Sequence, residues 1–130
     1  MPKLVNHEQY REELLEKCFD LFARNGFQGV TMREISKQLE VSTGTLYHYF
    51  PSKEEIFRQM IFQLSKRQVV FLRERFNRTK SFDERIHSLL QYVSKNETFF
   101  RNVLFLIIDY YRQNGLQDPE NFIRDIADYY

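Results

Sequence analysis

The sequence predicts an all-α protein, and three observations support this fold class. Apolar residues recur at intervals of three and four through most of the chain, which is the period of an amphipathic helix. The 130 residues include only four glycines and three prolines, and these stand where helices are expected to end. Three segments begin with a hydroxyl residue followed three positions later by glutamate, the pattern of an N-terminal capping box: Thr31/Glu34, Ser52/Glu55 and Ser81/Glu84.

These signals predict seven helices. The first covers residues 8–25, and Asn25-Gly26 supplies a left-handed stop at its end. Cys18 lies in the apolar stripe of this helix, where we expect it to be a small packing residue. The remaining helices are expected at residues 32–39, at 42 or 43 to 50, at 53–77, 82–94 and 97–113, and from Asp118-Pro119 to the end.

The predicted helices form two groups. Residues 1–52 contain three short helices, and we expect them to form an N-terminal bundle. The long fourth helix joins this bundle to a C-terminal helical bundle in residues 53–130. The last predicted helix stops without a C-terminal cap, so we expect the C-terminal bundle to be truncated.

Composition excludes several classes of protein. The most apolar run, residues 103–108, is far too short to span a bilayer, so no membrane segment is expected. The single cysteine cannot form an intramolecular disulfide, and no leader opens the chain, which favours a cytoplasmic protein. Paired carboxylates, a nucleophile with its base, a phosphate-binding loop and metal-spaced His or Cys residues are all missing from the pattern. We therefore expect neither an enzyme nor a cofactor or metal, and we regard His7, His48 and His87 as isolated.

Net charge does not indicate a nucleic-acid partner, because 19 basic residues face 18 acidic ones. DNA binding must therefore depend on a local surface. Between Leu39 and Leu46 one short helix ends and another begins, with Val41 in the turn and Ser42 as the N-cap, which is the spacing of a helix-turn-helix.

The second helix of this unit has two different faces. At about 100° per residue, Leu46, Tyr49 and Phe50 fall on one side. Gly44 and His48 point the opposite way, and Thr45 and Tyr47 flank them. A small, hydrogen-bonding outer face suits a helix that enters the major groove of DNA. A polar outer face is also common on short helices with no such role, so this face does not decide the function by itself.

Thr31 and Lys53 stand at the N-termini of the helices on either side of this unit. Free amides there favour a phosphate, and the hydroxyl and ammonium groups add donors. Each residue has an ordinary alternative, as a helix cap or as a solvated charge. Glu34 and Glu40 would repel phosphate, so we expect both to lie away from a DNA backbone.

The segment "LFARNGFQGVTMREISKQLEVSTGTLYHYFPSKEEIF", residues 21–57, resembles the DNA-binding region of the TetR family of bacterial transcriptional regulators. The resemblance covers about the first 57 residues. It implies core roles for Leu46 and Phe50, and Glu40 departs from it because the family often has a small residue at that turn. It also implies DNA-contacting roles for Thr31, Arg33, Ser42, Thr43, Gly44, Thr45, Tyr47, His48 and Lys53.

The same resemblance implies a variable C-terminal domain that binds a small ligand and forms a dimer. The predicted function is then a sequence-specific repressor that binds a palindromic DNA operator as a homodimer and is released by a small apolar effector. The aromatic-rich sixth helix supplies the candidate effector-binding residues Phe99, Val103, Tyr110 and Tyr111. The alternative is a helical protein–protein interaction module without sequence-specific DNA binding.

Overall fold

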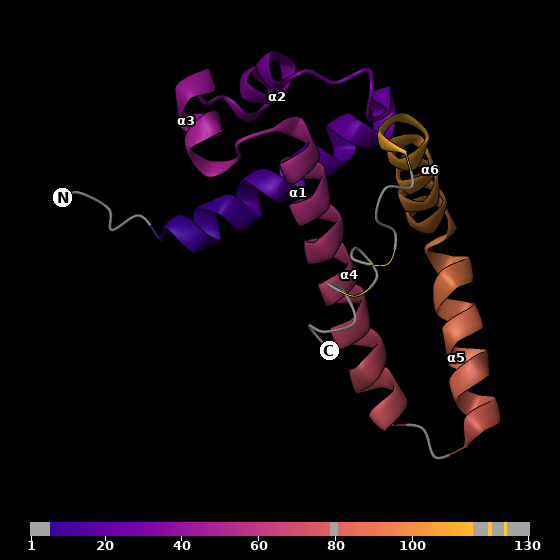
Figure 1. Ribbon diagram of the computed structural model, residues 1–130. Helices are drawn as coiled ribbons and strands as arrows, with labels where there is room; N and C mark the ends of the chain where they lie inside the picture. Colours follow the sequence, from indigo (N-terminus) through magenta and orange to yellow (C-terminus); the bar gives the residue numbers. More distant parts are fainter. Residues whose placement is uncertain (1–5, 79–80, 116–119, 121–123, 125–130) are drawn as a thin grey trace.

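A computed structural model describes residues 6–78, 81–115, 120 and 124 of the chain, and Figure 1 shows its ribbon. Its helices agree with the predicted ones to within one residue at most ends. The predicted helix that begins at Asp118-Pro119 lies outside the described residues. The described helices are α1 (His7–Asn25), α2 (Met32–Leu39), α3 (Thr43–Tyr49), α4 (Lys53–Asn77), α5 (Phe82–Lys95) and α6 (Glu97–Asn114).

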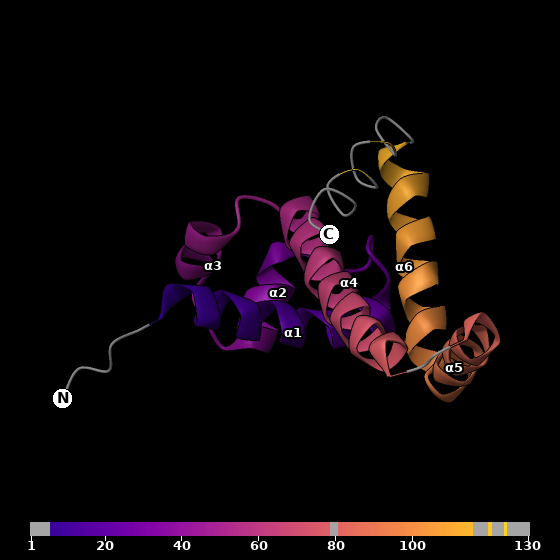
Figure 2. The same ribbon diagram turned by 90° about the horizontal axis from the view of Figure 1, so that it is seen from below.

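The long helix α4 connects two parts of the molecule (Figure 1). Its first half packs against α1, and its second half extends away from α2 and α3 to the turn before α5. Helix α5 runs back alongside α4, and α6 continues in the same general direction until it reaches α1. Seen from below in Figure 2, α5 lies on the side of the molecule away from α3.

One apolar core holds α1, α2, α3 and the first half of α4 together. Phe22, Val30, Ile35, Leu46 and Phe50 are completely buried in it. The start of α4 contributes four further buried residues, and α6 contributes Leu106. Residues on both sides of the predicted domain boundary, between 52 and 53, therefore contribute to this core. The boundary itself stays a prediction.

Cys18 is fully buried in α1, as its place in the apolar stripe predicts. Burial raises the pKa of its thiol to about 12, because the interior disfavours the charged thiolate. The thiol is therefore protonated at neutral pH and acts as a packing group.

Two of the three predicted capping boxes are confirmed. Thr31 and Ser81 each accept a hydrogen bond from the amide three residues later, and Glu34 and Glu84 bond back to the capping residue. At Ser52 only one of the two predicted hydrogen bonds is present, so the prediction of a full capping box there is wrong. Ser52 accepts from the amide of Glu55, but the Glu55 carboxylate bonds to side chains of the next turn, Arg58 and Gln59.

Glu40 connects α2 to α3 in the left-handed conformation, with φ 56° and ψ 39°. A residue with a Cβ pays about 1–2 kcal/mol for this conformation, which explains why a small residue is the easier choice there. The turn is nevertheless closed, because the amide of Val41 donates to the carbonyl of Ser36 at 3.0 Å. The helix-turn-helix spacing predicted from the sequence is therefore present.

The second half of the chain leaves many large apolar side chains exposed. On α5 these recur at intervals of three and four and form one stripe: Phe82, Ile86, Leu90 and Val93. Helix α6 adds a second exposed set: Leu104, Phe105 and Ile108. Helix α6 is thus apolar on more than its buried side, as its sequence predicts.

Candidate nucleic-acid interface

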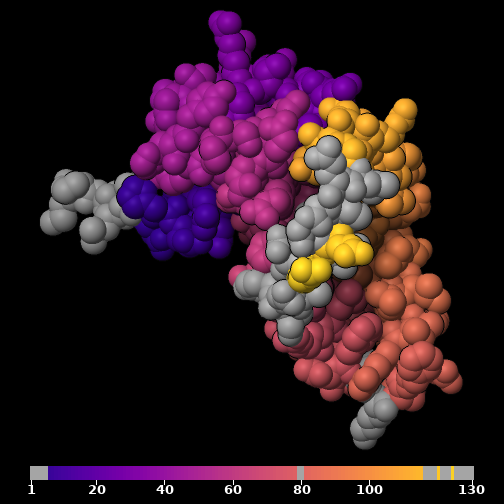
Figure 3. Space-filling model, viewed as in Figure 1, coloured from indigo at the N-terminus to yellow at the C-terminus, as the bar shows by residue number. Residues whose placement is uncertain are grey.

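Helix α3 presents the two faces that its sequence predicts. Leu46 and Phe50 anchor it, since neither has any exposed surface. Tyr47 is 52% exposed, and the other exposed residues of the outer face are Thr43, Gly44 and His48. In the space-filling view of Figure 3, the magenta atoms of this region form one edge of the molecule, well away from α5.

Ser42 and Thr45 shape the first turn of α3. The Ser42 hydroxyl accepts from the amide of Thr45 at 3.0 Å and donates to the Thr45 hydroxyl oxygen at 2.8 Å. The Thr45 hydroxyl proton is therefore not used in this pair, and Ser42 acts chiefly as the N-cap. Both residues lie next to the exposed face, but Thr45 is half-buried.

Thr31 and Arg33 mark the beginning of α2, and both are exposed. The Thr31 hydroxyl is committed to the capping box: it accepts from the Glu34 amide and donates to the Glu34 carboxylate, each at 3.2 Å. The Glu34 carboxylate also accepts from the Thr31 amide at 2.8 Å. Capping thus holds the Glu34 carboxylate beside Thr31, and the expectation that Glu34 and Glu40 lie away from a DNA backbone stays a prediction.

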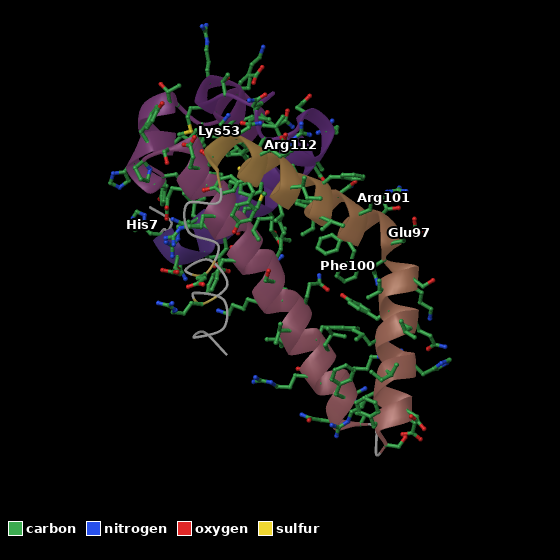
Figure 4. All side chains as sticks on the ribbon, turned by 45° about the vertical axis from the view of Figure 1, so that its right-hand side comes forward. His7, Lys53, Glu97, Phe100, Arg101 and Arg112 are labelled. Carbon is green, nitrogen blue, oxygen red and sulfur yellow. The ribbon has the colours of Figure 1, made fainter. Side chains whose placement is uncertain are left out.

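Lys53, at the start of α4, is turned toward the loop between α1 and α2. Its Nζ donates to the carbonyl oxygen of Phe27 at 2.9 Å and lies 4.3 Å from the centre of the Phe27 ring. Figure 4 labels Lys53 close to the end of α6, where Arg112 lies. An ammonium group has three donors, so this contact leaves donors for a second partner.

The amide of Phe27 contacts α6. The Phe27 amide donates to Asp109 Oδ2 at 2.8 Å, across 82 positions of sequence. Gly26 makes room for this carboxylate, since a Cβ there would lie 3.2 Å from Asp109 Oδ2, and its φ of 73° also favours glycine. We call this arrangement the Phe27 clamp: Asp109 on the amide and Lys53 on the carbonyl.

Aromatic packing completes the contact between α6 and the first helices. Tyr110 stacks on Phe57 with ring centres 4.7 Å apart, and its edge meets Phe27 at 5.0 Å. Burial raises the pKa of Tyr110, and the charge of Glu54 adds to this effect. In Figure 3 the orange atoms at the end of α6 lie against the purple atoms of the first helices.

The four predicted effector-binding residues lie along α6, and all four are half-buried. Phe99 packs on Phe19 of α1, with ring centres 5.4 Å apart, and Val103 packs against the core. Tyr111 lies edge-on to Tyr110 at 5.6 Å. A groove of about 490 Å³ lies between α6 and the α1–α2 loop, but other α6 residues line it, among them Asn102, Phe105 and Arg112.

Sequence reasoning missed two contacts that position these elements. The sequence pattern gives no role to Asp109, and it indicates His7 only as an isolated histidine. His7 Nδ1 lies 2.8 Å from the hydroxyl oxygen of Tyr49, which links the first turn of α1 to α3. A lone carboxylate within an apolar helix is the one local signal that could have pointed to Asp109.

Within the ranges that the structure describes, no three or more His, Cys, Asp and Glu side chains come together as a metal-binding group. No helix among those described is both long enough and apolar enough to cross a membrane.

The geometry defines a helix-turn-helix protein, in which α2 supports α3 and α3 presents a polar outer face. Comparison with known proteins agrees, because residues 14–60 match the family model for bacterial regulatory proteins of the tetR family. Over this segment the chain is similar to transcriptional regulators of the TetR family.

Individual relatives extend this finding. The chain is 29% identical to the transcriptional regulator UidR of Escherichia coli over 110 residues, which cover 85% of this chain and 54% of UidR. It is 29% identical over 51 residues to IcaR of Staphylococcus epidermidis, a negative regulator of a biofilm operon; these cover 39% of this chain and 28% of IcaR.

A solved structure shows the same fold. The ketosteroid transcriptional regulator KstR2 of Mycobacterium tuberculosis matches with a TM-score of 0.71 and 25% sequence identity, over 96% of this chain and 63% of KstR2. The chain thus spans about half the length of a curated relative such as UidR.

The Phe27 clamp predicts a measurable loss of stability when Asp109 is removed. Asp109→Ala leaves the partly buried Phe27 amide without its partner, so we expect the free energy of unfolding to fall by about 1–3 kcal/mol in urea titrations followed by circular dichroism. Asp109→Asn keeps an acceptor oxygen and should lose less.

Arg101→Ala is the matched control on the same helix. It removes an exposed ion pair with Glu97, so its effect should stay below about 1 kcal/mol. An Asp109→Ala variant as stable as this control would show that the clamp contributes nothing to folding.

Proposed function

We propose that this chain is the DNA-reading part of a transcriptional regulator and that α3 is its recognition helix. The observation that carries the proposal is the outer face of α3, where exposed hydrogen-bonding side chains surround Gly44 and two fully buried anchors fix the helix from behind. Such a helix reads base edges in the major groove, while the helices on either side contact phosphates.

The proposed contacts fall into two groups. Thr43, Gly44, Tyr47 and His48 lie on the outer face of α3, with Ser42 and Thr45 at its first turn, and these are the residues we assign to the groove. Phosphate contacts are assigned to Thr31, Arg33 and Lys53. Thr31 and Lys53 each have an internal partner already, so a phosphate there shares the hydroxyl or ammonium group with that partner.

Repression is the mode of action we propose. IcaR is described as a negative transcriptional regulator, and its similarity to this chain lies within a stretch of 51 residues. A repressor of this kind acts on bacterial chromosomal DNA, which places the proposed protein in the cytoplasm.

A homodimer is the second part of the proposal. One recognition helix reads too few base pairs to specify an operator, so two copies must be held about 34 Å apart on a palindrome. The exposed apolar stripe of α5 and the exposed side chains of α6 supply surface that a second copy can cover.

A small apolar effector is the third part. Phe99 and Tyr110 of α6 pack directly on α1 and α4. A ligand that displaces the aromatic side chains of α6 therefore changes the packing of the helices that support the proposed DNA surface. Tyr111 and Val103 complete the proposed site.

The recognition helix is tested by Tyr47→Ala and His48→Ala. Each change removes an exposed contact, so operator affinity at fixed salt should fall by about tenfold, measured by fluorescence anisotropy, with thermal stability unchanged. The operator is obtained by selection from random DNA. If both variants bind it as tightly as the parent chain, α3 is not the reading helix.

Lys53→Met serves as the comparison in that experiment, because it keeps the apolar stem and removes the charge. A phosphate contact at Lys53 predicts weaker binding to every DNA sequence and a salt slope smaller by about one. An unchanged slope together with lower stability would assign Lys53 to the Phe27 clamp alone.

The dimer is tested by sedimentation at increasing protein concentration. Self-association should be weakened by Leu90→Glu, which places a charge in the middle of the α5 stripe, and not by Gln91→Glu at the neighbouring exposed position. Equal association of both variants would exclude α5 from the interface.

The effector site is tested with a fluorescent apolar probe. Tyr111→Ala and Val103→Ala should each weaken probe binding several-fold, whereas Phe82→Ala on α5 should not. Loss of binding in the Phe82→Ala variant alone would place the probe on the α5 stripe and remove support for a site on α6.

A further inference from the structure

The groove of about 490 Å³ between α6 and the α1–α2 loop is separate from the residues assigned to DNA and to the apolar effector, none of which is among its described lining residues. We propose that this groove binds a small apolar amino acid as its zwitterion, with the carboxylate at Arg112 and the ammonium group at Asp109. Its volume lies within the range of small-ligand sites, about 300–1,000 Å³. The site is independent of DNA reading, so it is tested on the chain alone.

The α6 wall of the groove offers apolar surface between polar groups. Asn102, Phe105, Asp109 and Arg112 recur at intervals of three and four, so they share one face of the helix. Phe105 is 63% exposed, and Ile108 beside it is 45% exposed. A ligand with an apolar body that covers these side chains removes their surface from water, which favours binding.

The opposite wall has little side chain, because two glycines line it. A Cβ on Gly26 would lie 3.2 Å from Asp109 Oδ2, and one on Gly29 would lie 2.2 Å from the carbonyl oxygen of Asn25. The main chain after α1 therefore meets the groove without side chains of these two residues to cover it. The C-terminus of a helix carries partial negative charge, so the end of α1 favours a positive group at this wall.

Among the described residues that line the groove, Asp109 and Arg112 are the two that carry charge. They stand three positions apart, yet Asp109 Oδ2 accepts from the Phe27 amide and Oδ1 accepts from Gln113 at 3.3 Å. Arg112 forms no ion pair with any residue that the structure describes, whereas Arg101 on the same helix has one. Figure 4 shows Arg112 toward the end of α6 that meets the first helices, and Arg101 toward the other end. The guanidinium group is thus available to a ligand.

The two charges favour a ligand that carries both. A molecule with only a carboxylate pairs with Arg112 but is repelled by Asp109 one turn away, and a molecule with only an amine meets the reverse. A zwitterion pairs with both groups. Arg112 can bind its carboxylate with two parallel hydrogen bonds, and Asp109 keeps lone pairs for its ammonium group, because a carboxylate has about four acceptor sites. The ammonium group then lies between Asp109 and the end of α1, and the apolar side chain covers Phe105.

The experiment measures binding of L-phenylalanine to the isotope-labelled full chain by NMR titration. Three matched ligands each lack one element: 3-phenylpropionate has no ammonium group, 2-phenylethylamine has no carboxylate and glycine has no apolar side chain. Phenylalanine should bind with a Kd of about 0.1–1 mM, as its size allows. It should bind at least about threefold more tightly than each matched ligand. The amides of Gly26, Gln28 and Gly29 should shift.

Two variants separate the two charges. Arg112→Gln should abolish the preference for phenylalanine over 2-phenylethylamine, and Asp109→Asn should abolish the preference over 3-phenylpropionate. Asp109→Asn keeps an acceptor oxygen for the Phe27 amide, so the wall of the groove is retained. Arg101→Gln, which removes a charge from the same helix outside the groove, is the control and should bind all four ligands as the parent chain does.

The results that overturn the site are specific. Phenylalanine that binds no more tightly than 3-phenylpropionate or 2-phenylethylamine, or preferences that survive in both variants, would remove the paired charges from the site. Shifts that leave out Gly26, Gln28 and Gly29 would place the ligand elsewhere, and no shift at about 10 mM would exclude binding.

A further variant keeps the test decisive if Asp109→Asn does not fold. Phe105→Ala should weaken the three ligands that carry a phenyl ring and leave glycine unchanged, because it removes exposed apolar surface alone. Equal binding of phenylalanine to this variant and to the parent chain would contradict the proposed position of the ring. None of these outcomes changes the proposed recognition helix, whose tests use DNA.

Discussion

The main chain of Phe27 is held at both its amide and its carbonyl, and the relation of α6 to helices α1 and α2 depends on these two bonds. Asp109 accepts from its amide at 2.8 Å and Lys53 donates to its carbonyl at 2.9 Å. The carboxylate of α6 thus accepts from the amide of Phe27, and the ammonium group of α4 donates to the carbonyl oxygen of the same residue. The Phe27 ring fills the space between them against Phe57 and Tyr110.

This arrangement means that α6 is part of the surface on which α2 is built. Only four positions separate Phe27 from Thr31, the N-cap of α2, so the bond to Asp109 lies close to the start of α2. Gly29 allows little slack in between, because a Cβ there would lie 2.2 Å from the carbonyl oxygen of Asn25. A short, tightly packed segment therefore joins the contact with α6 to the start of α2.

The sequence predicts the helices well because their ends are set by neighbouring residues. Thr31 and Glu34 form a capping box from three positions apart, and Gly26 ends α1 with its own φ. The two faces of α3 likewise follow from helical geometry alone. The partners of individual polar side chains are harder to predict from the sequence, as Ser52 and Glu55 show. The bond from the Glu55 amide to the Ser52 hydroxyl is predictable, but the Glu55 carboxylate bonds to two side chains of the next turn.

The contacts that the sequence could not supply join residues that are far apart in the chain. Phe27 and Asp109 are separated by 82 positions, and His7 and Tyr49 by 42. No local pattern specifies either pair, because each depends on the angle at which whole helices pack. The direction of Lys53 has the same origin: its position at a helix N-terminus suggested a phosphate, whereas the fold places a carbonyl oxygen within its reach.

Cys18 gives this chain an internal reporter of its own opening. It is the single cysteine of the sequence and lies in the middle of α1, in the core that α1 shares with α4 and α6. Its thiol has no exposed surface, and burial holds it in the unreactive protonated form. A thiol reagent can therefore reach it only in molecules whose core has opened. The rate of labelling thus measures how often the core opens, and no engineered probe is needed.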